Sequence, residues 1–220
     1  MDDQIEIKKF GDITVRVSYP SGSGLHPVIL LLHGWTGDEN SMWIFTNHLP
    51  TNHILVAPRG LYSSPLGGFS WDLDQTKGWP SVNDFSSAIE SLNQLLDEKY
   101  IHEADFSQVS LVGFSQGAAL AYTHILQYPS RFLRFVGLSG FLPEDIESLT
   151  TNQPLIGKEG YVTHGTQDHL VPVDKARKAV KFLESAGAKV TYCEDDVGHK
   201  LSLECFVGME NFFKRSIGST

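Results

Sequence analysis

The stretch Val109-Ser110-Leu111-Val112-Gly113-Phe114-Ser115-Gln116-Gly117-Ala118 decides how the rest of this chain is interpreted. A β-prone, largely apolar run leads into it, and helix-prone residues follow it directly. Between them lies G-x-S-x-G, the pattern of a nucleophile elbow, in which a strand turns sharply into a helix. Such a turn predicts a strained backbone at Ser115 and leaves room only for glycine at positions 113 and 117. The Ser115 hydroxyl is then raised above the sheet, at the N-terminus of the helix.

Length and composition favour one globular domain spanning residues 1–220. Of these residues, 41% are hydrophobic and 20% are charged, which suits a fold with a single sizeable core. No apolar run reaches the ~18 residues of a membrane span, and the acidic start Met1-Asp2-Asp3-Gln4 is unlike a secretory leader. The formal charge of −9 disfavours binding to nucleic acid and to anionic membrane surfaces.

The chain contains two cysteines, and both fall in predicted regular structure. Cys193 lies in a predicted strand and Cys205 in a predicted helix. We expect buried free thiols, while a disulfide between them stays open as the alternative. This cysteine usage and the absence of a leader favour a cytoplasmic location.

Strands and helices alternate along most of the chain. Residues 5–10 and 14–19 alternate apolar and polar side chains around Gly11-Asp12, as in an antiparallel hairpin. Buried strands are predicted at 27–32, 54–57, 109–112, 135–138, 160–163 and 189–193, and helices at 82–99, 116–128, 172–186 and 201–214. The sequence therefore predicts an α/β fold with a mostly parallel sheet and helices on both faces. Residues 59–80 show no periodicity, and a loop of this length is usually functional.

A serine hydroxyl needs an adjacent base to act as a nucleophile at neutral pH. In open α/β sheets, reactive groups gather where strands end, which leaves His33, His164 and His199 as candidates, with His169 a step further along its loop. His33 and His164 each precede a glycine and are interpreted as turn and packing residues. His199 stands between the last strand and the last helix, and we expect it to be the base.

The base needs a carboxylate that holds its tautomer and stabilises the imidazolium. Asp168 follows a strand in His164-Gly165-Thr166-Gln167-Asp168 and is the preferred acid. Asp145, in a Pro-Glu-Asp helix start, and Asp195 or Asp196, beside the histidine, are its rivals. The resulting order along the chain is serine, acid, histidine.

An oxyanion hole completes this type of site. Its first donor is expected to be the backbone N–H of the residue after the nucleophile, here Gln116. The second comes from the loop after the early strand, where Trp35 follows His33-Gly34.

Taken together, these stretches resemble the phospholipase/carboxylesterase family of α/β-hydrolases, which includes the acyl-protein thioesterases. The resemblance rests on Leu31-Leu32-His33-Gly34, Gly68-Phe69-Ser70-Trp71-Asp72, Gly113-Phe114-Ser115-Gln116-Gly117-Ala118, His164-Gly165-Thr166-Gln167-Asp168 with Val171-Pro172, and Gly198-His199. It implies a serine esterase without metal or cofactor, acting on carboxylic esters or thioesters. Trp35 departs from the family, since a small or aliphatic residue is more usual there. Residues 59–80 match the family only around the aromatic-Asp segment.

Several aromatic and aliphatic residues are predicted on loops at the active-site side. We expect substrate to contact Tyr62, Phe69, Trp71, Phe141 and Leu142, with Trp35, Trp43 and Trp79 nearby. Apolar walls with few charges favour an uncharged acyl or aryl ester. Arg59 is open to two interpretations, either as the partner of a substrate carboxylate or as a solvated surface residue.

The predicted function is hydrolysis of small or medium-chain carboxylic esters, thioesters and lysophospholipids included, through an acyl-enzyme. The expected partners are a small-molecule ester and, at most, a second copy of the chain, giving a monomer or a homodimer. Two alternatives stay open. A non-catalytic ligand receptor of the same fold would fail to react with a fluorophosphonate, and a peptidase of the same fold would cleave aminoacyl anilides.

Overall fold

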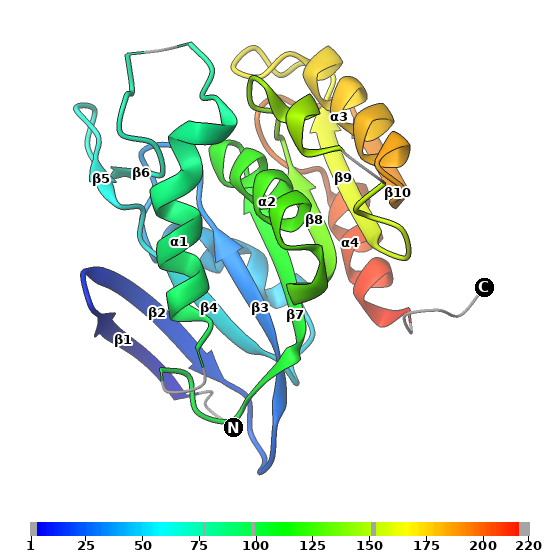
Figure 1. The fold of residues 1–220 in the computed structure, drawn as a ribbon. Helices are drawn as coiled ribbons and strands as arrows, with labels where there is room; N and C mark the ends of the chain where they lie inside the picture. The colour runs from blue at the N-terminus through cyan, green and yellow to red at the C-terminus, as the bar shows by residue number, and fades with distance from the viewer. Residues whose placement is uncertain (1–3, 77, 98–99, 151–152, 216–220) are drawn as a thin grey trace.

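The computed structural model describes residues 4–76, 78–97, 100–150 and 153–215. Within these ranges the main sheet has eight strands in the order β1-β2-β4-β3-β7-β8-β9-β10 (Figure 1). Their bounds are β1 (Gln4–Phe10), β2 (Ile13–Tyr19), β3 (His26–Leu32), β4 (Ile54–Pro58), β7 (Ala104–Phe114), β8 (Phe132–Leu138), β9 (Glu159–Gly165) and β10 (Lys189–Asp195). The β1–β2 and β2–β4 pairs are antiparallel and the other neighbouring pairs are parallel. The predicted mostly parallel sheet with an N-terminal hairpin is confirmed.

Helices cover both faces of this sheet, as predicted. The α-helices are α1 (Ser86–Leu95), α2 (Gln116–Gln127), α3 (Val173–Ser185) and α4 (Leu203–Lys214). Short 3₁₀ helices are η1 (Ser41–His48), η2 (Val82–Phe85), η3 (Pro129–Arg131) and η4 (Ile146–Leu149). In Figure 1, α1, α2 and α3 lie in front of the sheet and α4 lies behind it. The 3₁₀ helix η1, which the sequence pattern does not predict, packs beside α4 on that rear face.

The apolar run of β3 shows why a central strand needs two apolar faces. Successive side chains of a strand point to opposite sides. Leu30 and Leu32 therefore pack into the core under α1, α2 and α3, while Ile29 and Leu31 pack into the core under η1 and α4. All four side chains are fully buried. This continuous burial fixes β3 in the middle of the sheet and sets the direction of the loop that follows it.

The segment from 59 to 80 holds more regular structure than its sequence indicates. A small hairpin, β5 (Tyr62–Ser63) and β6 (Phe69–Ser70), stands beside the carboxyl ends of the central strands. The Thr36 N–H donates to the Phe69 carbonyl at 2.9 Å and the Phe69 N–H to the Gly37 carbonyl at 2.9 Å. These bonds join the hairpin to the loop after β3.

A capping box formed by Ser81 and Asp84 starts the next helix. The Ser81 N–H donates to Asp84 Oδ2 at 2.7 Å. The helix begins as η2 and continues as α1 only to Leu95, so the predicted helix to residue 99 is too long, with 98–99 outside the described residues.

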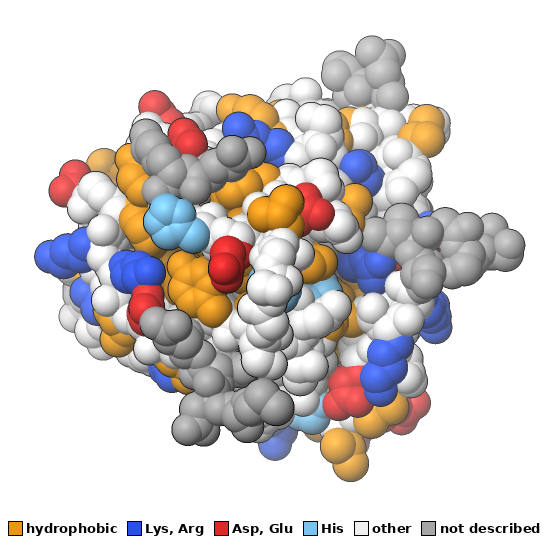
Figure 2. Space-filling model, turned by 90° about the horizontal axis from the view of Figure 1, so that it is seen from below, with side chains coloured by type: hydrophobic (Ala, Val, Ile, Leu, Met, Phe, Trp, Pro, Cys, Tyr) orange, Lys and Arg blue, Asp and Glu red, His pale blue; other side chains and the backbone are white. Residues whose placement is uncertain are grey.

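The two ends of the molecule differ. Figure 2 shows the end away from the carboxyl ends of the parallel strands, where apolar side chains are interspersed with charged ones of both signs. Among the described residues, no helix combines the length and the apolar character needed to cross a bilayer. Ser115 directly after β7 and Asp168 shortly after β9 lie at the other end, where these parallel strands finish.

Candidate active site

Ser115 occupies the turn between β7 and α2 with φ 54° and ψ −116°. A positive φ is unfavourable for a residue with a Cβ atom, so the turn carries the backbone strain that its tightness predicts. A Cβ on Gly113 would lie 2.2 Å from the Gly117 carbonyl oxygen, and one on Gly117 would lie 2.1 Å from that of Leu32. The opposite arm of the turn excludes a side chain at position 113, whereas the neighbouring strand β3 excludes one at 117.

The loop after β3 passes directly beside the serine. A Cβ on Gly34 would lie 3.2 Å from Ser115 Cβ. Trp35 follows in this loop, and Gln116 is the first residue of α2. Among the described residues, neither the Trp35 nor the Gln116 backbone N–H donates a hydrogen bond to the protein. Two unused N–H groups beside a serine are the donors that an oxyanion hole requires.

The buried His33 ring stabilises the loop after β3 through two hydrogen bonds. Its Nε2 accepts a hydrogen bond from the Gly60 N–H at 2.8 Å, and its Nδ1 lies 2.7 Å from the Gly34 carbonyl oxygen. Because the Gly60 N–H can only donate, Nδ1 carries the proton and donates to Gly34. Burial lowers the pKa of His33, which keeps the ring in this neutral form. The interpretation of His33 as a turn residue agrees with this geometry.

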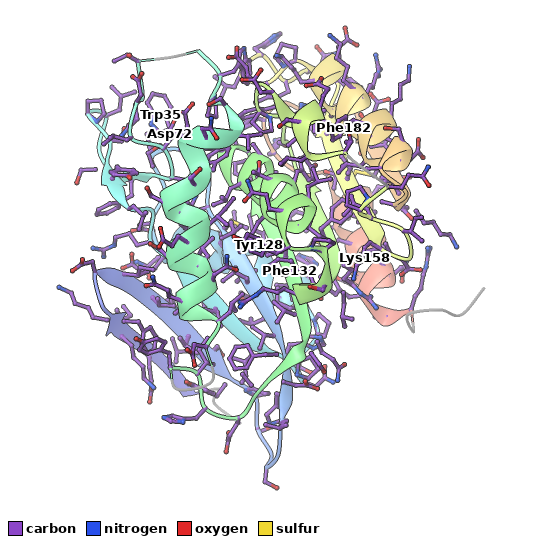
Figure 3. The ribbon with its side chains drawn as sticks, viewed as in Figure 1. Trp35, Asp72, Tyr128, Phe132, Lys158 and Phe182 are labelled. Carbon is purple, nitrogen blue, oxygen red and sulfur yellow. A yellow bond between two sulfur atoms is a disulfide. The ribbon has the colours of Figure 1, made fainter. Side chains whose placement is uncertain are left out.

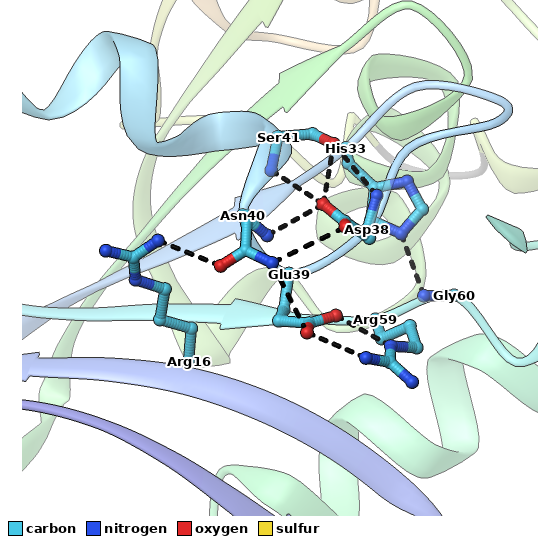
Figure 4. A network of polar contacts seen from close by, with 8 residues as sticks. All are labelled: Arg16, His33, Asp38, Glu39, Asn40, Ser41, Arg59 and Gly60. Atoms are coloured by element: carbon cyan, nitrogen blue, oxygen red, sulfur yellow. Dashed lines mark hydrogen bonds and ion pairs between the residues drawn. The ribbon is translucent and has the colours of Figure 1, made fainter. Parts of the chain in front are cut away.

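An ion pair supports the same loop from the other side (Figure 4). Arg59 donates from Nε and Nη2 to the two carboxylate oxygens of Glu39, at 2.6 and 2.7 Å. The Glu39 side chain is almost fully buried, and the bonds from Arg59 lower the pKa of its carboxyl. The guanidinium also lies 4.6 Å from the centre of the Phe69 ring. Both interpretations of Arg59 offered above are corrected, because its charge is already matched within the protein.

A second network fixes the side chain of Gln116. Its Oε1 accepts from the Trp71 N–H at 3.1 Å, and its Nε2 donates to Asp72 Oδ1 at 2.8 Å. Ser70 Oγ also donates to Asp72 Oδ1. The Trp71 indole N–H reaches the His33 carbonyl at 2.8 Å. Sequence reasoning gave Asp72 no role, although the aromatic-Asp segment that carries the family resemblance contains it.

Asp168 and His199 meet in the structure. His199 Nδ1 lies 2.6 Å from Asp168 Oδ2. The Leu170 and Val171 backbone N–H groups both donate to Asp168 Oδ1 at 2.9 Å. The carboxylate is fully buried, and the imidazole is 17% exposed with its ring centre 4.9 Å from that of Phe114. With its Nδ1 proton held by the carboxylate, His199 keeps Nε2 unprotonated and able to accept a proton.

His164 is also near Asp168, but it is placed differently. Its Nε2 lies 3.3 Å from Asp168 Oδ2 and donates to the Val171 carbonyl at 2.7 Å. The ring is fully buried, and burial lowers its pKa. His164 is not part of the cavity wall beside Ser115, whereas His199 is. The geometry therefore suits a packing residue at 164 and a base at 199.

The rival acids are placed elsewhere. Asp145 is exposed at the start of η4. Asp195 Oδ1 accepts from the Asp196 N–H at 2.7 Å, and Asp196 Oδ1 accepts from Gln167 Nε2 at 2.9 Å. Among the described residues, none of these three carboxylates bonds to His199.

A cavity of about 550 Å³ brings the candidate groups together. Ser115, Gln116, Trp35 and His199 all line it. Its apolar wall includes Trp79, Phe141, Leu170 and Val171, and its polar lining includes Asp72 and Gln75. The Trp35 indole N–H donates to Gln75 Oε1 at 2.8 Å, so the tryptophan is tied to the long loop across the rim. Figure 3 places Trp35 and Asp72 at this same end of the molecule.

Of the five predicted substrate-contacting residues, only Phe141 lies in this wall. Trp71 is 1% exposed and belongs to the main core. Phe69 packs under Arg59, Tyr62 lies in β5, and Leu142 packs against the main core. The expectation is corrected for Trp71, which the core encloses, and stays a prediction for Phe69, Tyr62 and Leu142. The wall also includes Leu170 and Val171, which sequence reasoning did not assign even though they closely follow Asp168.

The expectation of free thiols is also corrected. Cys193 near the end of β10 and Cys205 in the first turn of α4 form a disulfide across a separation of 12 residues. His199 lies between them in the sequence. The loop that carries the candidate base is therefore closed at both ends by a covalent bond.

Comparison with known proteins agrees with the fold. The family model described as Phospholipase/Carboxylesterase matches residues 20–217. Acyl-protein thioesterase 1 of Kluyveromyces lactis is 28% identical over 177 residues, covering 71% of this chain and 76% of that protein. A carboxylesterase of Arabidopsis thaliana is 26% identical over 133 residues, covering 59% of this chain and 58% of that protein.

A solved structure provides the comparison of folds. The crystal structure of a carboxylesterase from Mesorhizobium loti superimposes with a TM-score of 0.81 at 18% identity, covering 94% of this chain and 97% of that one. At this identity the likeness concerns the fold alone.

Proposed function

Because this chain belongs to the phospholipase/carboxylesterase family of hydrolases, we propose that it is a serine carboxylesterase in which Ser115, His199 and Asp168 form the catalytic triad. The observation that carries the proposal is the Asp168–His199 hydrogen bond of 2.6 Å, made by an imidazole that lines the same cavity as Ser115. Proximity of a hydroxyl, a base and an oriented carboxylate is the arrangement that activates a serine.

The first half of the proposed reaction forms an acyl-enzyme. His199 Nε2 takes the proton from Ser115 as the hydroxyl oxygen attacks the ester carbonyl carbon. The Trp35 and Gln116 N–H groups donate to the resulting oxyanion, and each such donor is worth about 3–4 kcal/mol of transition-state stabilisation. The imidazolium, stabilised by Asp168, then protonates the leaving alcohol as the bond to the carbonyl carbon breaks.

The second half reverses these roles with water. His199 removes a proton from a water molecule, whose oxygen attacks the acyl carbon. The same two N–H groups hold the second oxyanion, and Ser115 leaves with the proton returned by the imidazolium. The products are a carboxylic acid and the regenerated serine.

The cavity wall supports uncharged acyl groups of small or medium length as substrates. Trp79, Phe141 and Leu170 offer apolar surface beside Ser115, while Asp72 is the one carboxylate among the described residues of the lining. Such a wall favours apolar acyl chains and disfavours anionic ones. Thioesters and lysophospholipids remain within the proposed substrate range.

Replacement of Ser115 tests the proposal. The Ser115→Ala variant should fold normally and lose several orders of magnitude in kcat toward a p-nitrophenyl ester, since no other group can form the acyl-enzyme. The control is Ser139→Ala, which removes a buried hydroxyl that makes no hydrogen bond among the described residues. Retained turnover in Ser115→Ala would remove this serine from the nucleophile role.

We further propose that residues 1–220 form one domain, active as a monomer or a homodimer. The cytoplasmic location predicted from the sequence also stays a proposal, and the Cys193–Cys205 disulfide weighs against it because disulfides persist mainly in oxidising compartments. Alkylation of thiols in intact cells, followed by mass spectrometry, separates the two cases. Alkylated cysteines support the cytoplasm, and an unmodified disulfide contradicts it.

A further inference from the structure

A second hollow, of about 440 Å³, lies on the other side of the candidate base. Its apolar wall comes from η1 and α4, with Met42, Ile44 and Phe45 facing Phe206. The Phe45 and Phe206 rings pack with their centres 5.8 Å apart. Apart from His199 itself, the charged residue in its lining is Lys200.

The two hollows share some lining residues and differ in the others. Trp35, Phe114 and His199 line both of them. Ser115 and Gln116 line only the first, whose apolar wall comes from the loops above α1, α2 and α3. The second draws its apolar wall from η1 and α4, which cover the opposite face of the sheet. An ester bound over Ser115 thus has one apolar hollow on each side of His199.

The chemistry of acyl transfer decides which part of the ester enters which hollow. The acyl group stays bonded to Ser115 after the first step, so it belongs to the hollow that Ser115 lines. The leaving oxygen or sulfur must lie within hydrogen-bond reach of the base that protonates it. The group attached to that atom therefore extends past His199, toward the hollow that His199 lines without Ser115.

We propose that the hollow between η1 and α4 is a leaving-group site that takes the apolar alcohol or thiol part of the substrate. This inference rests on the proposed function. Ile44 is 71% exposed, so an alkyl chain bound there covers apolar surface that the fold leaves in water. A short alcohol gains nothing from this wall, whereas each further methylene adds contact.

A leaving-group site has a kinetic signature that an acyl site lacks. Contacts with the alcohol act while the acyl-enzyme forms and are gone when water cleaves it. Changes to Ile44 therefore alter kcat/KM according to the alcohol, and the rate of acyl-enzyme hydrolysis stays the same.

Paired variants and paired esters test the proposal. Ile44→Asp places a charge in the second hollow, and Leu170→Asp places one in the first, at a side chain that is also 71% exposed. Hydrolysis is followed by pH-stat with ethyl acetate, hexyl acetate and ethyl hexanoate. The alcohols of the first two esters have similar intrinsic reactivity, so the ratio of their kcat/KM values reports binding of the alkyl chain.

In Ile44→Asp we expect the hexyl-to-ethyl acetate ratio to fall about tenfold or more, by the loss of methylene burial, while the ethyl hexanoate-to-acetate ratio is kept. Leu170→Asp should lower the ethyl hexanoate-to-acetate ratio and keep the hexyl-to-ethyl acetate ratio. The melting temperature of Ile44→Asp should match that of the wild type. In such protein, the proposal is overturned if the substitution lowers the ethyl hexanoate-to-acetate ratio instead, or if it lowers neither ratio. If wild-type protein hydrolyses none of the three esters, the proposed function fails as well, which distinguishes the two failures.

Discussion

At the scale of single residues, Asp168 is fixed before it meets the base. Backbone N–H groups of Leu170 and Val171 occupy one carboxylate oxygen, which leaves the other for His199 Nδ1. The orientation of the imidazole is thus set by the loop after β9 and not by the histidine alone. The carboxylate selects the tautomer in which Nε2 is free to act on Ser115.

Asp168→Asn should abolish the selection of the His199 tautomer, although asparagine has nearly the same shape as aspartate. Because Oδ1 must still accept from two N–H groups, the new amide nitrogen faces His199 Nδ1 and donates to it, which moves the imidazole proton to Nε2. We expect kcat toward a p-nitrophenyl ester to fall by about 10⁴, by comparison with other triads. Asp145→Asn, at an exposed rival carboxylate, is the control. A loss below tenfold in Asp168→Asn contradicts the assignment.

The residues singled out from the sequence fall into two groups. Ser115, Asp168 and His199 were identified by motif and by the rule that reactive groups gather at strand ends, and the structure brings Asp168 and His199 into contact. Trp71 and Tyr62 were assigned to substrate because aromatic rings stood in a loop. A loop without periodicity carries no signal that separates a ring facing the core from one facing a cavity.

At the scale of elements, the disulfide joins β10 to α4 and closes the loop that carries His199. The hydroxyl of Tyr161, in β9, donates to the Cys205 carbonyl at 2.9 Å, so α4 is also held by a hydrogen bond to the sheet. Whether two cysteines meet depends on how a helix packs on a strand. The sequence predicted a strand and a helix at these positions but contained nothing that fixed their contact.

Removal of the disulfide should destabilise the fold. A loop of about this length gives a chain-entropy stabilisation of about 3 kcal/mol. We expect the Cys193→Ala, Cys205→Ala double variant to lose free energy of unfolding of that order, measured by urea titration. Dithiothreitol should lower the stability of wild-type protein to a similar extent and leave the double variant unchanged. Equal free energies of unfolding for the variant and the wild type under oxidising conditions would contradict a stabilising disulfide.

At the scale of the whole molecule, buried neutral histidines link stability to pH. His124 is fully buried on α2, with Nε2 donating to Asn93 Oδ1 at 3.0 Å and Nδ1 buried without a partner among the described residues. Burial, and to a lesser extent Arg131, lowers the pKa of His124 to about 3. Burial likewise lowers the pKa of His53 to about 4.

The free energy of unfolding should therefore fall as the solution is acidified below about pH 6.5, the usual pKa of histidine in an unfolded chain. In that range the unfolded state binds protons that the folded state does not, at a cost of up to about 1.4 kcal/mol per pH unit for each such histidine. His124→Gln keeps an N–H donor for Asn93 and does not titrate. Urea titrations should show a shallower decline for this variant between pH 6.5 and pH 4, and an identical slope would contradict the assignment.

The architecture as a whole was the most predictable level. Buried apolar runs alternate with amphipathic helices from β3 onward, and this pattern leaves few topologies for a mostly parallel sheet. The 3₁₀ helix η1 was missed, although with α4 it forms the wall proposed to receive the leaving group. Its apolar residues Met42 to Phe45 follow one another without a polar break in an element of eight residues, so the sequence shows no clear helical period there.

The most direct test of the catalytic assignment is covalent labelling with a fluorophosphonate, mapped by peptide mass spectrometry. An activated serine reacts because its base removes the proton during attack on phosphorus. We predict one equivalent of label on Ser115, with labelling slowed at least about a hundredfold in His199→Ala, the scale of general base catalysis. Label on a different residue, or an unchanged rate in His199→Ala, would contradict the account.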